Sequence, residues 1–299
     1  MVVILKTVLS LMTAVFGAYF LSDALRKRKC FSGRPWAAFG ATGFVTNFLD
    51  TLGIGSFAQQ TAVFKFFRLV DDRIIPGTMN VGNTFPTVAE ALIFMSAVPV
   101  EPLTLVSMSL AAPAGSVLGA GVVARMPRRK IQLGMGFGLA VVALTMLGGL
   151  LRWWPMGGTA IGLAGGKLVL AAALSFVFGA LQTIGVGFYA PCMAIVYALG
   201  MHPRTAFPIM MTATAMLMAA GSARFVKEDA YDRKAALGLA AAGVLGVFLA
   251  AWVVRSLPLT VIKWVVLVAV LCTSVWMFLS ARRSGPPETT CDPGGPPSL

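Results

Sequence analysis

Polar side chains gather around two glycine breaks in an otherwise apolar sequence. The first break is Gly53-Ile54-Gly55 and the second is Gly185-Val186-Gly187. Unpaired N–H groups at a helix start, together with side-chain donors, suit the oxygens of a small anion. The alternative is that the glycines only allow close helix packing and the polar groups only hold helices together. The candidate substrate-binding residues are Asn47, Thr51, Gly53, Gly55, Ser56, Gln59, Asn80, Asn83, Thr84, Gln182, Thr183, Gly185, Gly187, Tyr189 and Thr212, with Gln60, Cys192 and Thr214 nearby.

Two acids lie in the same apolar regions and are candidates for proton coupling. Asp50 lies one helical turn before the first break, and Glu90 lies within the apolar segment 74–98. A carboxylate inside a bilayer is costly when ionised, so an acid there is a functional hypothesis by default. Asp50 ranks first because it lies at the break, where the second half of the chain has the neutral Gln182. The structural alternatives are a helix cap for Asp50 and, for Glu90, an ion pair with Lys65 or Arg68.

The composition predicts that membrane-spanning helices position these residues. Of 299 residues, 58% are hydrophobic and 12% are charged, whereas about a quarter are charged in soluble domains. A span needs about 20 apolar residues; the segments 56–70 and 188–200 are shorter, and each follows a glycine break. The expected fold class is therefore all-α, a polytopic membrane protein with broken, hairpin-forming helices at the midplane. The expected segments are 2–22, 36–52, 56–70, 74–98, 102–124, 131–151, 167–184, 188–200, 206–224, 235–254 and 259–280.

The chain contains an internal repeat. Residues 49–58 align with 181–190 at an offset of 182 − 50 = 132, and the same offset carries Pro76 to Pro208. We expect one transporter domain, 1–280, made of repeat 1 (about 2–124), repeat 2 (about 131–254) and an extra helix at 259–280. A Pro/Gly-rich tail, 281–299, is expected to be disordered. Chance similarity between apolar segments is the alternative, but break, proline and segment lengths agree at a single offset.

The charges predict an orientation. The net charge of +13 is concentrated in short basic stretches at 26–29, 125–130 and 282–283, and cytoplasmic loops carry such an excess of Lys and Arg. We therefore expect a multi-pass protein of the cell inner (plasma) membrane with its N-terminus outside and its C-terminus cytoplasmic. The two halves would then have inverted topology. Inverted repeats with broken helices at equivalent positions are typical of secondary transporters, which bind their substrate between the breaks.

Other function classes find little support in the residues. His202 is the only histidine, the four cysteines show no CxxC spacing, and no nucleophile–base motif is present. We therefore expect no enzyme activity, no metal and no cofactor. Because the basic residues lie in short loops, we expect no nucleic-acid partner; the expected partners are a small anionic substrate and the lipid bilayer. A homodimer, an anion channel and a non-transporting scaffold stay open as alternatives.

Three stretches resemble the sulfite exporter TauE/SafE-like permeases. They are the two glycine breaks, the run Leu-Gln-Thr-Ile-Gly-Val-Gly-Phe-Tyr-Ala-Pro-Cys-Met at 181–193 and Phe-Pro-Ile-Met-Met at 207–211. The resemblance covers roughly 36–280. It implies export of small sulfur-containing or organic anions, such as sulfite, sulfonates or carboxylates, driven by an ion gradient. The first half has Gly-Ile-Gly-Ser-Phe-Ala-Gln-Gln where many relatives carry a longer glycine run before a proline, which leaves the substrate open.

Overall fold

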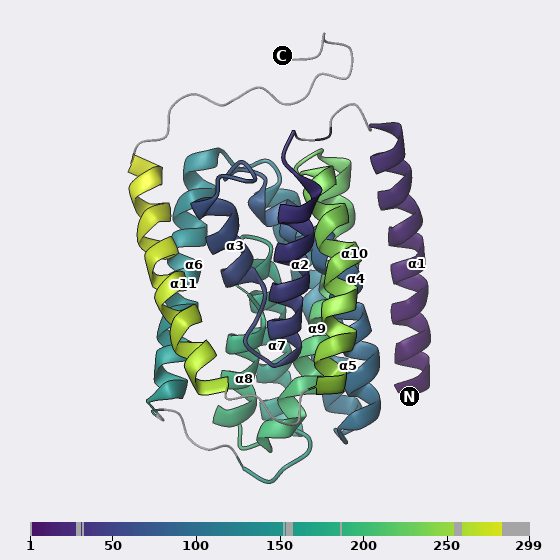
Figure 1. Ribbon diagram of the computed structural model, residues 1–299. Helices are drawn as coiled ribbons and strands as arrows, with labels where there is room; N and C mark the ends of the chain where they lie inside the picture. Colours follow the sequence, from purple (N-terminus) through teal and green to yellow (C-terminus); the bar gives the residue numbers. More distant parts are fainter. Residues whose placement is uncertain are drawn as a thin grey trace.

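The protein is an all-helical bundle in the computed structural model, which describes residues 2–27, 31, 33–151, 153, 158–185, 187–253 and 259–282 (Figure 1). The expected tail lies almost wholly outside these residues. Within them the helices are α1 (Val2–Arg26), α2 (Trp36–Thr51), α3 (Phe57–Phe66), α4 (Ile75–Ala97), α5 (Pro102–Val123), α6 (Arg128–Leu150), α7 (Gly165–Gln182), α8 (Tyr189–Ala198), α9 (Ala206–Lys227), α10 (Arg233–Val253) and α11 (Leu259–Arg282), with a 3-10 turn, η2 (Pro203–Thr205). Each lies within a few residues of its expected segment.

The outside of the bundle is apolar. Leu, Val, Phe and Trp side chains are exposed along most helices, up to 84% for Trp252. Five helical stretches among the described residues are long and apolar enough to cross a membrane: Val2–Arg26, Pro102–Val123, Gly165–Gln182, Pro203–Lys227 and Arg233–Trp252. Because such a surface is stable in hydrocarbon and not in water, the chain is a multi-pass membrane protein.

Two helical hairpins enter the bundle from opposite ends (Figure 1). The outer ends of α2 and α3 lie at the end of the bundle where α11 finishes, and the outer ends of α7 and α8 lie at the other end. Both second arms, α3 and α8, have 10 residues, a length of about 15 Å at 1.5 Å per residue. The hydrocarbon core is about 30 Å thick. The N-termini of α3 and α8 therefore lie well inside the bundle, and neither second arm crosses a membrane fully.

Each first arm packs on a partner helix through the same kind of glycine contact. A Cβ added to Gly246 of α10 would meet the Phe44 carbonyl oxygen of α2 at 2.3 Å, and one added to Gly115 of α5 would meet the Phe176 carbonyl oxygen of α7 at 1.9 Å. The two phenylalanines are 176 − 44 = 132 residues apart and the two glycines 246 − 115 = 131. The close approach of α2 to α10 thus recurs between α7 and α5, while α4 and α9 pack on each other between these pairs.

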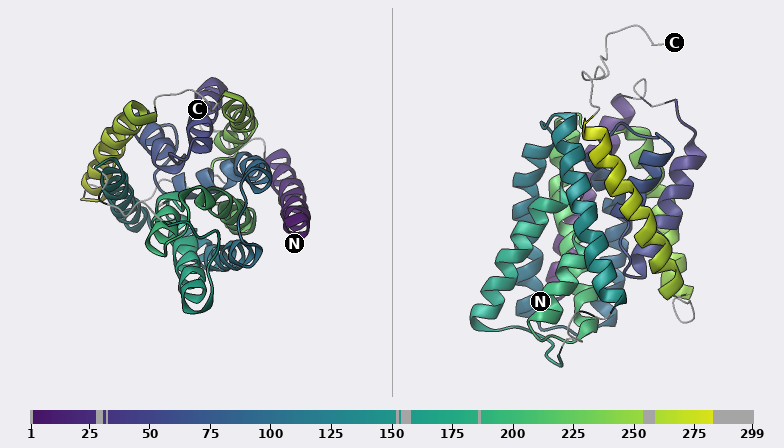
Figure 2. Two further views of the ribbon diagram at one scale, coloured as in Figure 1. Left: turned by 90° about the horizontal axis from the view of Figure 1, so that it is seen from below. Right: turned by 90° about the vertical axis from the view of Figure 1, so that its left-hand side faces the viewer.

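The first helices of the two expected repeats have different neighbours. Helix α1 lies at the edge of the bundle, where it contacts α9 and α4 (Figure 2). Helix α6, the segment expected to correspond to it, packs mainly on α11 and also contacts α8. Similar packing is therefore seen in the hairpins and the helices that hold them, and not in the contacts of α1 and α6.

Hydrogen bonds secure the connections at both ends of the bundle. At the end where α1 finishes, the Tyr231 hydroxyl donates to Asp23 at 2.6 Å and the Arg233 guanidinium donates to the same carboxylate at 2.8 Å. Burial, and then the neighbouring Asp23, raise the pKa of Tyr231. At the opposite end Glu101 caps α5 by accepting from the Thr104 hydroxyl and backbone N–H, which lowers the pKa of Glu101.

Candidate functional site

The breaks have a backbone shape that glycine adopts readily. Their φ values are +80° at Gly53, +87° at Gly55, +102° at Gly185 and +76° at Gly187. A side chain at such an angle strains the backbone, because its Cβ approaches the following carbonyl oxygen. The positive angles turn the chain sharply between the arms of each hairpin, so the second arm starts inside the protein.

Each break packs against the other half of the chain. A Cβ added to Gly53 would lie 3.1 Å from the Phe207 ring and 3.9 Å from the Met210 methyl carbon, both on α9. A Cβ added to Gly185 would lie 3.5 Å from the methyl carbon of Met79 on α4 and 3.3 Å from that of Met135 on α6. Each break is therefore contacted by a central helix of the other half, α9 at Gly53 and α4 at Gly185, and Gly185 is also contacted by α6 of its own half.

Open space lies beside the second glycine of each break. An added Cβ at Gly55 or at Gly187 would have no atom within 4 Å, leaving out the neighbouring residues. Both positions immediately precede the N-terminus of a half-length helix, α3 or α8. A small ligand could therefore approach the backbone there, next to N–H groups and a positive dipole end.

Glu90 joins the two hairpins. Its Oε1 accepts a hydrogen bond from the Thr51 hydroxyl at 2.8 Å, and its Oε2 accepts one from the Tyr189 hydroxyl at 2.7 Å. Thr51 ends α2 and Tyr189 begins α8, so a carboxyl on α4 connects both breaks. Glu90 and Thr51 are fully buried, or nearly so, and Tyr189 is 7% exposed.

An amide cluster lies on the first half. Asn83 accepts from Asn47 at 3.0 Å and from Gln60 at 2.8 Å, and its own amide donates back to Gln60 at 2.6 Å. Gln60 also donates to the Thr46 hydroxyl at 2.8 Å. The cluster connects α2, α3 and α4 away from solvent. Thr46, whose role the sequence analysis missed, lies on the same face as Thr42 and Asp50 at four-residue spacing, which is a usable signal.

Asp50 contacts the start of α3. Its carboxylate accepts the Ser56 hydroxyl at 2.9 Å and the Ser56 backbone N–H. Ser56 is the N-cap residue of α3, so Asp50 binds the residue from which this half-length helix starts. This is the geometry of the structural alternative for Asp50, whereas Glu90 has the geometry of a group shared between the hairpins.

The other candidate residues lie in the same interior without joining the Glu90 group through the hydrogen bonds of the described residues. The Gln59 amide donates to the Gly55 carbonyl at 2.5 Å, the Asn80 amide to Pro76, the Thr84 hydroxyl to Asn80, and the Thr183 hydroxyl to Ala180. Thr84 also contacts Ser222 at 3.2 Å. The side-chain amide oxygens of Asn80 and Gln182 and the hydroxyls of Thr212 and Thr214 are buried without a protein partner.

The ion pair considered for Glu90 does not form. Lys65 pairs with Asp72 in the connection between α3 and α4, and the Gln132 amide also reaches that carboxylate at 2.7 Å. Lys65 is buried and does not reach towards the surface, while Arg68 is exposed. The positive φ of Arg68 turns the chain back at the end of α3, and this turn brings Asp72 next to Lys65. No ion pair among the described residues includes Asp50 or Glu90.

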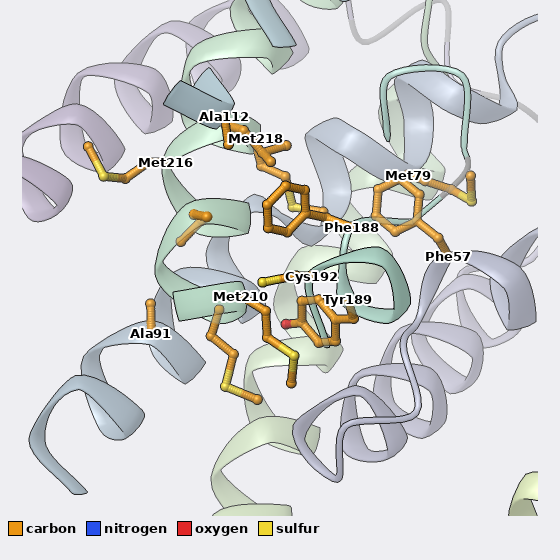
Figure 3. Close-up of a cluster of buried hydrophobic side chains, with 14 of the residues drawn as sticks. Phe57, Met79, Ala91, Ala112, Phe188, Tyr189, Cys192, Met210, Met216 and Met218 are labelled. Carbon is orange, nitrogen blue, oxygen red and sulfur yellow. The ribbon is translucent and has the colours of Figure 1, made fainter. Parts of the chain in front are cut away.

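The second break has apolar and sulfur-containing surroundings. Figure 3 shows Cys192 and Tyr189 facing Met210, with Phe188 nearby. The described residues contain no group of three or more His, Cys, Asp or Glu side chains able to hold a metal ion. The groups described around the breaks supply hydrogen bonds and the ends of two half-length helices.

The sequence matches the family model "Sulfite exporter TauE/SafE" over residues 2–146 and 158–298. The chain belongs to this family. TauE/SafE proteins are transporters, so this chain is a membrane transporter and not an enzyme, with a small substrate and the bilayer as its partners. Comparison with curated proteins and with solved structures finds no significant match.

Proposed function

We propose that this TauE/SafE protein is a secondary transporter that exports small sulfur-containing or organic anions, such as sulfite, sulfonates or carboxylates, together with protons. The observation that carries the proposal is the connection of both hairpin breaks through Glu90. A group that contacts both halves of a transporter can respond when one half moves against the other.

The anion would bind through neutral donors and helix ends. The N-termini of α3 and α8 begin inside the bundle next to the open space at Gly55 and Gly187. Unpartnered hydroxyls on α9, Thr212 and Thr214, are available to donate. Asp50 and Glu90 form no ion pair among the described residues; Lys65, for example, pairs with Asp72, and Arg233 with Asp23. The proposal therefore does not use a basic side chain to neutralise the charge of the anion.

Glu90 can satisfy its hydrogen bonds with or without a proton. The Thr51 hydroxyl has two acceptors in reach, Glu90 Oε1 at 2.8 Å and the Asn47 carbonyl oxygen at 2.9 Å. When Glu90 is ionised, Thr51 donates to it. When Glu90 is protonated, it can donate to Thr51, which turns its own hydrogen to Asn47, while Tyr189 still donates to Oε2. Asp50 has no such arrangement because Ser56 offers it two donors.

Anion and proton binding would therefore be linked. An anion near an ionised Glu90 is repelled in a low-dielectric interior, whereas an anion near a neutral Glu90 is not. Thermodynamic linkage then requires that anion binding raises the affinity for the proton, and that proton binding raises the affinity for the anion by the same factor. We expect calorimetric titrations of sulfite, taurine and acetate, in buffers of different ionisation enthalpy, to reveal proton uptake with the ligand that binds. Binding without proton uptake would exclude Glu90 as the coupling group.

The two halves are proposed to be inverted repeats. Hairpins that enter from opposite ends, the recurring glycine contacts and two family-model matches of similar length support this arrangement. The ends of α1, α5 and α11 and the start of α6, which carry or adjoin the described residues of the basic stretches, lie at one end of the bundle (Figure 1). We infer that this end is cytoplasmic. In a background without native cysteines, Arg129→Cys should react with an impermeant thiol reagent only from the cytoplasm, and Thr159→Cys only from outside. Labelling of both from one side would contradict the arrangement.

Transport itself can be tested in proteoliposomes. A secondary transporter should show saturable anion flux, accumulation driven by a pH gradient, and counterflow between labelled and unlabelled anion. A channel would give flux without saturation or counterflow, and a scaffold would give none. The proposal fails if purified, monodisperse protein moves none of sulfite, a C2 sulfonate or a small carboxylate against its gradient.

A further inference from the structure

A cluster of charged and amide side chains joins the two halves at the proposed cytoplasmic end of the bundle. The Lys65 ammonium pairs with Asp72, and the Gln132 amide donates to the same carboxylate at 2.7 Å. The Arg128 guanidinium lies 3.3 Å from a carboxylate oxygen of Asp71 and 3.8 Å from one of Asp72. Lys65 lies in the last turn of α3 and the two acids lie in the connection to α4, whereas Arg128 and Gln132 lie at the start of α6. The cluster therefore connects the first hairpin to the first helix of the second half.

Helix α6 extends this contact to the second break. A Cβ added to Gly134 would lie 2.6 Å from the Ile184 side chain, and one added to Gly185 would lie 3.3 Å from the Met135 methyl carbon. Both of these α6 residues follow Gln132 within one helical turn. The helix also contacts α8, the half-length helix after the break. A movement of the start of α6 would therefore move side chains that contact the second break.

The contact can open without leaving a buried charge unpaired. The side chains of Lys65 and Asp72 are only 9% and 6% exposed. Both belong to the first half, so they stay paired if α6 moves away. The bonds that would break are the Gln132 hydrogen bond and the ion pairs of Arg128, whose side chain is 34% exposed and can be hydrated. Separating the partners of a buried ion pair is strongly destabilising, and this arrangement avoids it.

The two ends of the bundle are held together by different contacts. Every ion pair formed by the described residues lies at the end where α1 and α11 finish. At the opposite end the halves meet through neutral hydrogen bonds: the Glu101 N–H donates to the Ile161 carbonyl and the Leu163 N–H to the Thr104 hydroxyl, both at 2.8 Å. Among the described residues, electrostatic closure between the halves is therefore confined to one end.

We propose that Lys65, Asp71, Asp72, Arg128 and Gln132 form a cytoplasmic latch, which holds α6 against the first hairpin and releases it to open the second break to the cytoplasm. The latch rests on the secondary transport proposed for this chain, because an exporter must admit its anion from the cytoplasmic side. Release would then precede anion binding. The alternative is that the cluster only stabilises the fold.

The test is the rate at which N-ethylmaleimide alkylates Cys192 in purified protein whose Cys30, Cys272 and Cys291 are replaced by serine. Cys192 is fully buried on α8, so the reagent reaches it when the surrounding helices separate. Gln132→Leu should raise the rate about tenfold or more, because the closed state alone loses a hydrogen bond to a charged group. Arg128→Gln should raise it about threefold, because its ion pairs are partly exposed.

Two matched controls should leave the rate unchanged. Arg129→Gln removes the same charge from an exposed neighbour that forms no ion pair with the described residues. Ser274→Ala removes a buried hydrogen bond of 2.7 Å from α11 to the Gly136 carbonyl of α6, away from the first hairpin. Equal acceleration in Ser274→Ala would overturn the proposal. So would wild-type rates in both Gln132→Leu and Arg128→Gln, which would leave the cluster a structural contact.

Hydrogen exchange locates the opening. In Gln132→Leu the exchange should increase at 67–74 and 128–134 and stay as in wild type at 158–164. A uniform increase would mean general loosening and would also overturn the latch. If Gln132→Leu does not purify as a monodisperse protein, both measurements on Arg128→Gln decide. Neither measurement uses a substrate or a flux, so failure of the latch and failure of the proposed anion export are distinguishable.

Discussion

The two hairpin breaks have the same backbone shape but different chemistry. At an offset of 132, Asp50, Ser56 and Gln60 of the first break correspond to Gln182, Phe188 and Cys192 of the second. Side chains around the first break form hydrogen bonds with one another, as between Ser56 and Asp50 and between Gln60 and Asn83. The second break packs among methionines and aromatic rings. Among the described residues, the Tyr189 hydroxyl connects the second break to the first, through Glu90 and Thr51.

This difference separates two requirements of a transporter. The repeated part is geometric: positive φ at two glycines, a half-length helix starting inside, and open space beside it. The part present in only one half is the acid pair, Asp50 and Glu90, which correspond to Gln182 and Ser222 at the same offset. We infer that the repeated geometry provides the anion site and that the asymmetric groups provide proton handling, and each prediction below removes one of these parts.

The largest effect is expected from Glu90→Gln. Gln resembles the protonated acid, can still accept from Tyr189 and cannot release a proton. The variant should fold, bind the anion and exchange it across proteoliposomes, but lose accumulation driven by a pH gradient altogether. Asp50→Asn is the matched control and should keep most gradient-driven accumulation. The reverse result, with accumulation lost in Asp50→Asn and kept in Glu90→Gln, would assign the coupling role to Asp50.

Gly55→Ala and Gly187→Ala should cause the next largest loss. A left-handed conformation costs a non-glycine residue roughly 1–2 kcal/mol, and the new methyl group occupies the space proposed for substrate. We expect both variants to lose most anion transport at normal expression. Gly200→Ala is the control, because Gly200 also has a positive φ of 84° and no atom near its added Cβ, but lies in the connection after α8. An equal loss in Gly200→Ala would mean that backbone strain alone explains the effect.

Thr51→Val should weaken coupling without removing it. Valine has the shape of threonine but can neither donate to an ionised Glu90 nor accept from a protonated one. A hydrogen bond to a charged group is worth about 1.5–3 kcal/mol, so proton binding and anion affinity should change together. The measurement is anion affinity between pH 5 and 8 by calorimetry, where the pH profile should shift from that of wild type. Thr42→Val is the control, because the Thr42 hydroxyl lies on the same helix and donates to the backbone carbonyl of Ala38; this variant should keep the wild-type profile.

Much of this organisation could be predicted from the sequence, because glycine breaks and apolar lengths are local signals. The break at Gly53-Ile54-Gly55 and the half-length α3 followed directly from them. The partners of Glu90 could not be predicted, because Thr51 and Tyr189 lie 39 and 99 residues away and only the crossing of helices brings them to α4. The pairing of Lys65 with Asp72 was within reach, since opposite charges seven residues apart flank a short turn.

The smallest effect is expected on the stability of Asp50 variants. These variants distinguish a role of the Asp50 carboxyl as a helix cap from a role as a proton carrier. Asp50→Ala removes the acceptor for both the hydroxyl and the backbone N–H of Ser56, and loss of a helix cap costs about 1 kcal/mol. Asn accepts the same bonds without a charge, so Asp50→Asn should recover most of the thermal stability that Asp50→Ala loses. Thermal unfolding of both purified variants, without substrate, is the measurement.

The second break provides the control: Gln182→Ala removes a side chain whose carbonyl oxygen has no protein partner, so it should cost less stability than Asp50→Ala. If Asp50→Ala is as stable as wild type while its pH-driven transport falls, the carboxyl at the first break does not act as a cap, and proton handling in the first half would be shared by both acids.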